Sequence, residues 1–334
     1  IRNGEALQSA SELDTIIVDK TGTVTQGKPQ LTTCMPVNGF DETTAVSLAA
    51  SLEAGSEHPL GRAIINAANE LNITIESVTD FKALAGFGVE GKLNGKNLRI
   101  GNIRLMQRYD IDLSKVDSEL LQHSDQGETL VMLSLENKLV ALLGVTDPAR
   151  TDSSAAIHRL LEMGLNVIML TGDNLNTAQA VANSVGISQV IADVLPQDKA
   201  KKVSELQQLG RRVAMVGDGV NDAPALAQAN VGIAIGSGTD VAIESADIAL
   251  MRNSLHGVAD AISLSRATLS NIKQNLFGAF IYNSLGIPVA AGILFPFYGI
   301  LLSPIIAAAA MSLSSVTVVT NALRLRQLNL KAPQ

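Results

Sequence analysis

Four short apolar runs rich in β-forming residues recur along the chain. They cover residues 13–18, 166–170, 212–216 and 231–235. Helical spacing of apolar residues follows or separates the later runs, at residues 153–163, 176–185, 198–209 and 222–228. Strands that alternate with helices predict a parallel sheet with helical crossovers. Such a sheet gathers its chemistry at the carboxyl ends of its strands, where this sequence places Asp19, Thr171 and Asp218.

The gap between the first two runs predicts an inserted domain. About 150 residues separate Asp19 from the second run, too many for a single crossover. Residues 31–140 contain two helical stretches, 43–52 and 62–71, and alternating strands with an Asn94-Gly95 hairpin turn. We predict a small α+β domain there.

A long uncharged segment near the carboxyl end predicts membrane helices. No charged residue occurs from 274 to 323, which leaves 50 consecutive uncharged positions. One membrane-spanning helix needs about 20 apolar residues, so we predict spans at 275–294 and 302–322 with a turn at 295–299. Basic residues flank the pair on both outer sides, which predicts that both ends, and residues 1–262, are cytoplasmic. The alternative is a helical hairpin buried in a soluble core, which so long an uncharged run disfavours.

Composition narrows the function classes. The chain has 334 residues, of which 46% are hydrophobic and 17% charged. Residues 263–334 hold five basic and no acidic side chains, so the first 262 residues carry a net charge of −12. An acidic body argues against a nucleic-acid binder. A single cysteine, Cys34, excludes a disulfide scaffold and a cysteine-rich zinc site within the chain. Because no methionine opens the sequence, we expect a fragment or a processed chain.

The motif DKTGT, residues 19–23, directly follows the first predicted strand. A carboxylate at this place can act as a nucleophile and form an acyl-phosphate. Attack on a phosphate requires positive charge, normally Mg²⁺ and a lysine. Asp218, in the motif GDGVND, is a hard oxygen ligand, and Lys199 begins a predicted helix. The hydroxyl and amides of Thr171-Gly172 could hold phosphoryl oxygens. DKTGT alone could be a surface turn, but three such motifs at strand ends argue against coincidence.

These motifs, DKTGT, TGD at 171–173 and GDGVND at 217–222, resemble the signature set of P-type ATPases. Those enzymes are ion pumps built on a haloacid-dehalogenase-like Rossmann phosphorylation domain. The resemblance implies that ATP phosphorylates Asp19. Related phosphatases place an acid/base residue where this chain has Thr21, so the acyl-phosphate should hydrolyse slowly. The resemblance further implies that Mg²⁺ binds the carboxylates of Asp19 and Asp218 and the carbonyl of Thr21. It also implies that Thr171 and Lys199 stabilise the phosphoryl group. Asn221 and Asp222 would support the site.

The inserted domain carries SEHPL at residues 56–60, which resembles a motif of heavy-metal P-type ATPases. The resemblance implies that His58 helps to position the adenine of ATP. It also places Glu53, Gly86, Gly88 and Asn102 in the nucleotide pocket. Residues 86–91 also match the dinucleotide pattern GxGxxG, but a hairpin signal follows them where that pattern requires a helix. The resulting division is a phosphorylation domain at 1–30 and 141–262, a nucleotide-binding domain at 31–140, and the last two transmembrane helices with a tail at 263–334.

Polar residues in the predicted spans suggest the transported ion. Met311 and Ser315 lie one helical turn apart, and a thioether suits Cu⁺ or Ag⁺ better than hard cations. Neither span contains Asp, Glu, Lys or His, which argues against Zn²⁺, Ca²⁺ or Na⁺. Alternatively, the methionine fills a packing gap and the serines bond back to the helix. The pairs Tyr282-Asn283 and Met311…Ser315 resemble copper-type pumps, which implies that these four residues bind Cu⁺.

We therefore expect ATP-driven export of Cu⁺, with Ag⁺ as an open second substrate, by a monomeric multi-pass protein of the cell membrane. A copper chaperone stays open as a partner. The alternatives are a Zn²⁺/Cd²⁺ pump, or a membrane-anchored phosphatase or binding module that does not pump. Copper pumps also use a Cys-Pro-Cys motif and an actuator domain, which this chain lacks, so we predict that the chain alone cannot transport ions.

Asp147–Arg150 resembles the segment that links the inserted domain back into the phosphorylation domain. This segment could act as a hinge, or it could simply be the first turn of a helix.

Overall fold

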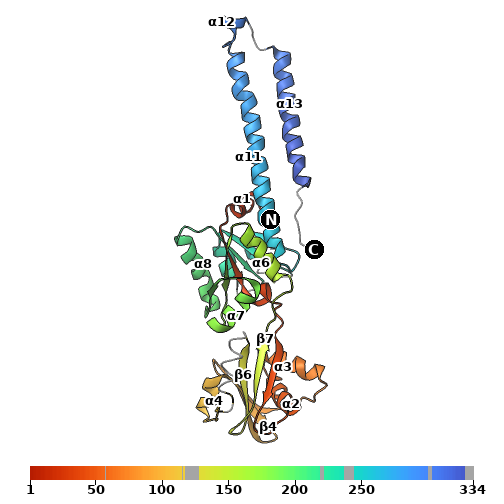
Figure 1. Cartoon of the computed structure of the whole chain (residues 1–334), viewed down its shortest axis with the longest axis vertical. Coiled ribbons are helices and arrows are strands. Elements are labelled where there is room, and N and C mark those ends of the chain that lie inside the picture. The colour runs from red at the N-terminus through yellow and green to blue at the C-terminus, as the bar shows by residue number, and fades with distance from the viewer. Residues whose placement is uncertain are drawn as a thin grey trace.

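The structure is a computed structural model that describes residues 1–56, 58–114, 116, 128–218, 222–236, 244–299 and 303–327. It contains two six-stranded sheets and a pair of long helices, stacked along one axis with the first sheet in the middle (Figure 1).

The first sheet is entirely parallel, with strand order β12-β11-β10-β1-β8-β9. The four predicted strands are confirmed, and the short edge strands β9 and β12 add to them. The bounds are β1 Thr15–Asp19, β8 Asn166–Leu170, β9 Gln189–Ile191, β10 Val213–Gly217, β11 Val231–Ile235 and β12 Ile248–Leu250.

Helices cover both faces of this sheet, which explains why its central strands are continuously apolar. Along β1, Ile16 and Val18 face one buried cluster and Ile17 faces the other, as strand alternation requires. One face is covered by α1 (Gly4–Ser11), α6 (Ser153–Glu162), α7 (Leu175–Val185) and the start of α11 (His256–Ala290); the opposite face is covered by α8 (Lys199–Gln208) and α9 (Ala223–Gln228).

The strand register brings three chain segments out at one edge. Asp19 pairs with Leu170 of β8, and Val18 pairs with Val216 of β10. Because all three strands run in the same direction, Thr171 and Asp218 leave the sheet beside Asp19. The central position of β1 therefore places a carboxylate between the two neighbouring loops.

The second sheet is antiparallel and lies between β1 and β8 in sequence, with strand order β2-β7-β6-β5-β4-β3. Its predicted Asn94-Gly95 turn joins β4 to β5, and both residues adopt positive φ as a two-residue hairpin needs. The sequence-based division at residue 140 falls inside β7. The bounds are β2 Gln30–Pro36, β3 Thr79–Leu84, β4 Gly88–Leu93, β5 Lys96–Gly101, β6 Thr129–Leu135 and β7 Lys138–Thr146; α2 (Glu42–Glu53) and α3 (Pro59–Glu70) cover one face and α4 (Ile103–Arg108) the other.

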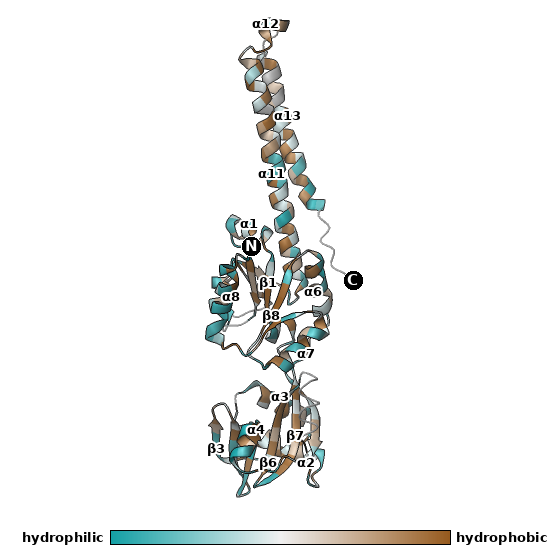
Figure 2. Ribbon diagram, turned by 60° about the vertical axis from the view of Figure 1, so that its left-hand side comes forward, coloured by the Kyte–Doolittle hydropathy of each residue, from teal (hydrophilic) through white to brown (hydrophobic). Residues whose placement is uncertain are grey.

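Two antiparallel helices, α11 and α13 (Pro304–Leu323), project from the first sheet, with the short α12 (Phe295–Tyr298) at the far tip (Figures 1 and 2). The predicted turn at 295–299 thus contains α12. Among the described residues, no helix combines the length and the apolar character that crossing a membrane requires. Six serine, threonine and asparagine side chains lower the apolar character of α13, and the first turns of α11 pack on the sheet.

Candidate functional site

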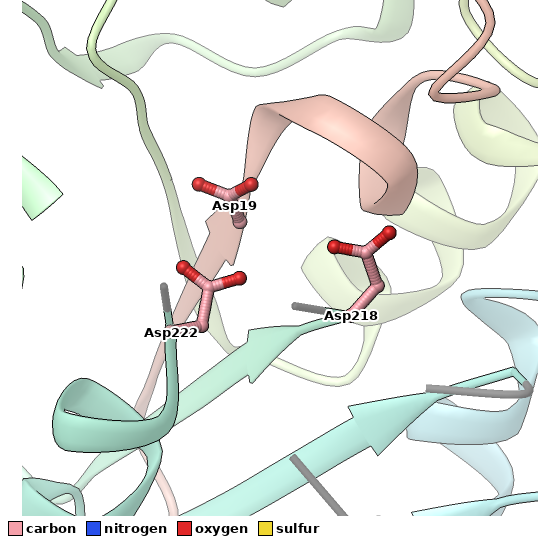
Figure 3. A group of neighbouring side chains, drawn as sticks. All are labelled: Asp19, Asp218 and Asp222. Atoms are coloured by element: carbon pink, nitrogen blue, oxygen red, sulfur yellow. The ribbon is translucent and has the colours of Figure 1, made fainter. Parts of the chain in front are cut away.

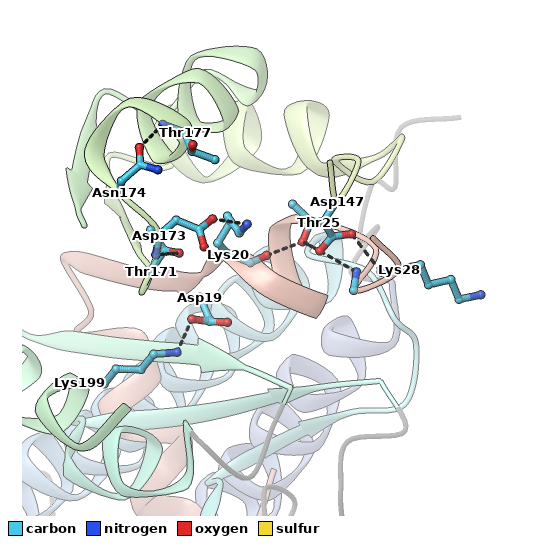
Figure 4. A network of polar contacts seen from close by, with 11 residues as sticks. Asp19, Lys20, Thr25, Lys28, Asp147, Thr171, Asp173, Asn174, Thr177 and Lys199 are labelled. Atoms are coloured by element: carbon cyan, nitrogen blue, oxygen red, sulfur yellow. Dashed lines mark hydrogen bonds and ion pairs between the residues drawn. The ribbon is translucent and has the colours of Figure 1, made fainter. Parts of the chain in front are cut away.

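Asp19 is the last residue of the central strand and its side chain is almost fully buried. The ammonium of Lys199, the first residue of α8, donates a hydrogen bond to Asp19 Oδ1 at 2.5 Å (Figure 4). It donates a second hydrogen bond to Asp222 Oδ1 at 2.7 Å. Residues 180 positions apart in sequence therefore form one buried ion pair. The fold therefore brings Asp19, the predicted nucleophile, into contact with Lys199, the lysine predicted to stabilise the phosphoryl group.

Asp218 and Asp222 complete a group of three carboxylates (Figure 3). One oxygen each from Asp19, Asp218 and Asp222 lies within 4.8 Å of the others, from the ends of β1 and β10 and from the start of α9. Two glycines make this approach feasible. A Cβ at Gly22, which has a φ of +73°, would overlap the Asp218 carboxylate, and a Cβ at Gly217 would meet Asp222.

The three carboxylates perturb one another. Burial raises the pKa of Asp19 to about 7, and the charge of Asp222 adds to this effect while Lys199 opposes it. Burial, with Asp222, also raises the pKa of Asp218. Burial lowers the pKa of Lys199, but the charges of Asp19 and Asp222 outweigh it and the pKa is raised. One ammonium among three carboxylates leaves a shortage of positive charge, so a hard divalent cation such as Mg²⁺ fits this set of oxygen ligands.

Thr171 is buried beside this group, directly after β8. Its Oγ1 accepts a hydrogen bond from the backbone N–H of Asp173 at 3.1 Å, and the Asp173 carboxylate forms an ion pair with Lys20 (Figure 4). Lys20 is a residue of the site for which the motifs predicted no role. Its opposite charge to Asp173, at the ends of two strands predicted to be in one sheet, is the signal that could have indicated the pair.

The segment from Asp147 to Arg150 holds the turn that follows Asp19. Arg150 donates hydrogen bonds to the backbone carbonyls of Gly22, at 2.7 Å, and Thr23, at 3.1 Å. Asp147 accepts hydrogen bonds from Thr25 Oγ1 at 2.5 Å and from the backbone N–H groups of Lys28 and Gly27 at 3.0 and 3.2 Å (Figure 4). Since α6 begins only at Ser153, this segment is not the start of a helix.

Two predicted nucleotide residues lie where α2 ends and α3 begins. Glu53 ends α2 and is buried, which raises its pKa, while a hydrogen bond from Ser56 opposes the shift. Gly61 of α3 leaves room for the Glu53 carboxylate, because a Cβ there would overlap it. His58 caps α3, since its Nδ1 accepts a hydrogen bond from the backbone N–H of Leu60 at 3.2 Å. Its Nε2 is the ring nitrogen that this cap leaves for a ligand.

The other three predicted nucleotide residues form a second group. Asn102 donates from Nδ2 to the carbonyl of Gly86 at 2.9 Å, and its Oδ1 caps α4 by accepting from the N–H of Leu105 at 3.1 Å. Gly86 and Gly88 adopt φ values of +78° and +147°, which favour glycine. Within the described part of the chain, no hydrogen bond or ion pair links this group to Glu53 and His58.

The remaining predicted residues belong to the turn after Asp19, to the motif GDGVND and to the helical pair. Asn221 and the side chains of Tyr282 and Asn283 lie outside the described residues. Thr21 is exposed in the turn after Asp19. Met311 is 71% exposed, and the hydroxyl of Ser315 donates to the Met311 carbonyl at 3.3 Å, so this serine bonds back to its own helix.

Comparison with known proteins identifies the family. A family model of haloacid dehalogenase-like hydrolases matches residues 13–230. The chain is also 50% identical, over 330 residues, to a copper-exporting P-type ATPase of Legionella pneumophila, an alignment that covers 99% of this chain and 45% of that protein. The chain belongs to the haloacid dehalogenase-like hydrolases and, among them, to the heavy-metal P-type ATPases. The family resemblance drawn from the motifs is therefore confirmed.

Two further comparisons concern other metals. A silver-exporting P-type ATPase of Salmonella typhimurium is 48% identical over 332 residues, covering 99% of this chain and 40% of that protein. The crystal structure of a zinc-transporting PIB-type ATPase in the E2·Pi state superposes with a TM-score of 0.78 at 35% identity, covering 97% of this chain and 51% of that chain. This P-type ATPase chain thus spans less than half the length of the curated relatives that it matches.

Proposed function

We propose that the chain is the catalytic part of an ATP-driven exporter of Cu⁺, with Ag⁺ as a second candidate substrate. Asp19 attacks the γ-phosphorus of ATP, the bond from that phosphorus to the β–γ bridging oxygen breaks, and ADP leaves. The product is an aspartyl-phosphate, which water later hydrolyses to phosphate. The contact between Lys199 and the buried Asp19 is the observation that carries this proposal.

The surrounding residues support the same reaction. Lys199 and the hydroxyl of Thr171 are placed to hold phosphoryl oxygens, and Asp222 holds Lys199. We assign Mg²⁺ to the carboxylates of Asp19 and Asp218 and to the backbone carbonyl of Thr21, and Asn221 to supporting this site. Mg²⁺ would supply positive charge to the transferred phosphoryl group. The chain itself buries the nucleophile, orients it through Lys199, and offers no acid/base group at Thr21, so hydrolysis of the intermediate is slow.

We assign the second sheet, nominally residues 31–140, to ATP binding through Glu53, His58, Gly86, Gly88 and Asn102. The first sheet, nominally 1–30 and 141–262, is then the phosphorylation domain. The buried Glu53 carboxylate supports a ligand-binding role, because its Oε2 has no hydrogen-bond partner among the described residues and burial raises its pKa. The cap on α3 fixes the ring of His58.

We further propose that residues 263–334 form the last two transmembrane helices and a tail, with residues 1–262 on the cytoplasmic side of the cell membrane. Large apolar side chains along the helical pair support this: Phe277 is 68% exposed, Leu285 67% and Ile305 80%. Tyr282, Asn283, Met311 and Ser315 are the proposed Cu⁺ ligands. We expect a monomer, and a copper chaperone as metal donor is a proposal that metal transfer assays would test.

The experiment is acid-stable labelling of the complete pump that contains this chain, incubated with γ-labelled ATP and a series of metals under reducing conditions. Asp19→Asn should abolish the labelling, and the surface control Asp193→Asn should keep it. Cu⁺ and Ag⁺ should stimulate turnover, and Met311→Ala should reduce that stimulation. Labelling that persists in Asp19→Asn would exclude Asp19 as the nucleophile; stimulation by Zn²⁺ or Cd²⁺ alone would exclude the copper assignment.

A further inference from the structure

Three asparagines join α11 to α13 near the end of the helical pair that lies closest to the first sheet. Asn271 Nδ2 donates to the backbone carbonyl of Asn321 at 2.7 Å. Asn321 Nδ2 donates to Asn275 Oδ1 at 2.9 Å, and Asn275 Nδ2 donates to Asn271 Oδ1 at 3.1 Å. Each residue donates to the next, so the three contacts close into a ring, which we call the asparagine ring.

The ring is well satisfied and largely shielded. Asn271 is only 8% exposed, and Asn275 and Asn321 are half-buried. The free Oδ1 of Asn321 accepts a hydrogen bond from Arg324 at 3.2 Å, which holds its amide in one orientation. A shift of either helix by one turn, about 5.4 Å, would separate every interhelical donor from its acceptor. The ring therefore defines one register between the two helices.

Apolar packing beside the ring does little to define that register. A cavity of about 240 Å³ lies between the helices, and Val318 is the one large apolar side chain that lines it. The rest of the lining consists of Gly278, Ser314, Thr317, Gln274 and the ring residues Asn275 and Asn321. A Cβ at Gly278 would meet no atom within 4 Å. A loosely packed seam does not resist sliding, because no large side chain fits into a matching hole. Buried asparagines are known to select one register between packed helices, and polar side chains hold helices together where water is scarce.

We infer that the asparagine ring is a register lock, and that Asn271, Asn275 and Asn321 are positioning residues for the polar side chains farther along the pair. Seven residues, two helical turns, separate Asn275 from Tyr282, and ten residues separate Met311 from Asn321. The lock therefore sets how the proposed metal-binding residues of α11 and α13 are aligned; this consequence, unlike the lock itself, rests on the proposed function.

The lock also joins α13 to the first sheet through α11. Arg266 of α11 donates hydrogen bonds to three backbone carbonyls, those of Met163 at 3.2 Å, Leu13 at 3.3 Å and Ser11 at 3.4 Å. These carbonyls lie at the ends of α6 and α1 and just before β1, where a cation is favourable. Arg266 precedes Asn271 by little more than one turn. Because one rigid helix carries both anchors, α13 must follow α11 when the base of α11 moves.

The test is cross-linking in the full chain in detergent micelles, with Cys34→Ser to remove the native thiol. The contacts of Asn321 with Asn271 and Asn275 place Gly278 between Ser314 and Thr317, so Gly278→Cys combined with either Ser314→Cys or Thr317→Cys reports the native register. The pair Gly278→Cys and Ala310→Cys, one turn beyond Ser314, reports a shift of one turn. We expect the ratio of native to shifted cross-linking to fall at least threefold when Asn275→Leu and Asn321→Leu are combined. Helix content, measured by circular dichroism, should not change, because leucine has a similar volume and favours helices.

Thr320→Leu is the matched control, since this exposed residue of α13 lies on the same turn as Asn321 and outside the ring, and it should leave the ratio within a factor of 1.5. A ratio that the double substitution leaves unchanged would overturn the register lock. Metal-stimulated ATPase activity of the complete pump, measured on the same variants, separates the two proposals. A lower cross-linking ratio with unchanged metal stimulation supports the lock and contradicts the assignment of the metal ligands.

Discussion

Replacement of Asp19 by asparagine should make the free energy of unfolding of the metal-free protein less dependent on pH. The pKa of Asp19 rises from 3.8 to about 7 on folding, chiefly through burial. Between these values the folded protein holds a proton that the unfolded chain has lost. The contribution of Asp19 to the free energy of unfolding is therefore fully present below about pH 4 and is lost as the pH rises through 7. The loss occurs because the ionised form of Asp19 is unfavourable when buried and beside Asp222. Asparagine has the same shape and no proton to lose.

The expected magnitude follows from proton binding. With a folded-state pKa of about 7, raising the pH from 6 to 8 should cost about 1.4 kcal/mol of folding free energy, a factor of ten in the folding equilibrium constant. Asp218, whose pKa is also raised, leaves a residual pH dependence in the variant. The informative quantity is therefore the difference in slope between the two proteins.

The assay is urea unfolding followed by circular dichroism at pH 6, 7 and 8, with EDTA present to remove divalent ions. The matched control is Asp193→Asn, an exposed position with a φ of +56° that asparagine tolerates. The control should retain the full pH dependence, whereas Asp19→Asn should lose about 1.4 kcal/mol of it. Adding Mg²⁺ should flatten the curves of the unmodified protein and of the Asp193→Asn control, which both keep Asp19. Equal slopes in all three proteins would refute the raised pKa of Asp19.

Two further substitutions probe the same site. Lys199→Met should reduce acid-stable labelling at least about 100-fold and destabilise the protein by roughly 3–5 kcal/mol at neutral pH, because it leaves two buried carboxylates without their cation. Lys201→Met, at an exposed position of the same helix, should be nearly neutral in labelling and in urea unfolding. Gly22→Ala should weaken Mg²⁺ binding at least tenfold by displacing Asp218, measured by titration of the stability increase with Mg²⁺. Unchanged Mg²⁺ affinity in that variant would contradict the placement of the Asp218 carboxylate.

Much of the first sheet could be predicted because its central strands are apolar on both faces and end in recognisable motifs. The three-residue strands β9 and β12 could not, since such short runs carry no periodic signal. The motifs also drew attention to Asp19 and Asp218, and the start of the predicted helix at 198–209 drew attention to Lys199. They did not indicate how strongly burial shifts the pKa of Asp19, because that shift depends on how α8 and α9 pack.

The asparagine ring could not be predicted from the sequence either. A polar residue in an apolar helix can face solvent, a ligand or another helix, and spacing alone does not distinguish these cases. The sequence drew attention to Met311 and Ser315 by the chemistry of their side chains. The same inspection did not draw attention to Asn271, Asn275 or Asn321, although Asn321 is hydrogen-bonded to both of the others across the two helices. Their pairing depends on the antiparallel register of two segments almost 50 residues apart.

The connection between the sheets should bend beyond Lys28 and not at the turn itself. Arg150 and Asp147 bind the two ends of residues 22–28 from one short segment, so the turn after Asp19 and its return strand form one unit. Asp147→Ala removes three hydrogen bonds to a carboxylate and should lower the cost of local opening by about 1.4 kcal/mol or more. Hydrogen exchange at the backbone N–H of Thr25, which donates to the Lys20 carbonyl within the turn, should then become about tenfold faster. Asp41→Ala, which removes a helix cap elsewhere, should leave that exchange rate unchanged; equal acceleration in both variants would show that Asp147 does not hold the turn.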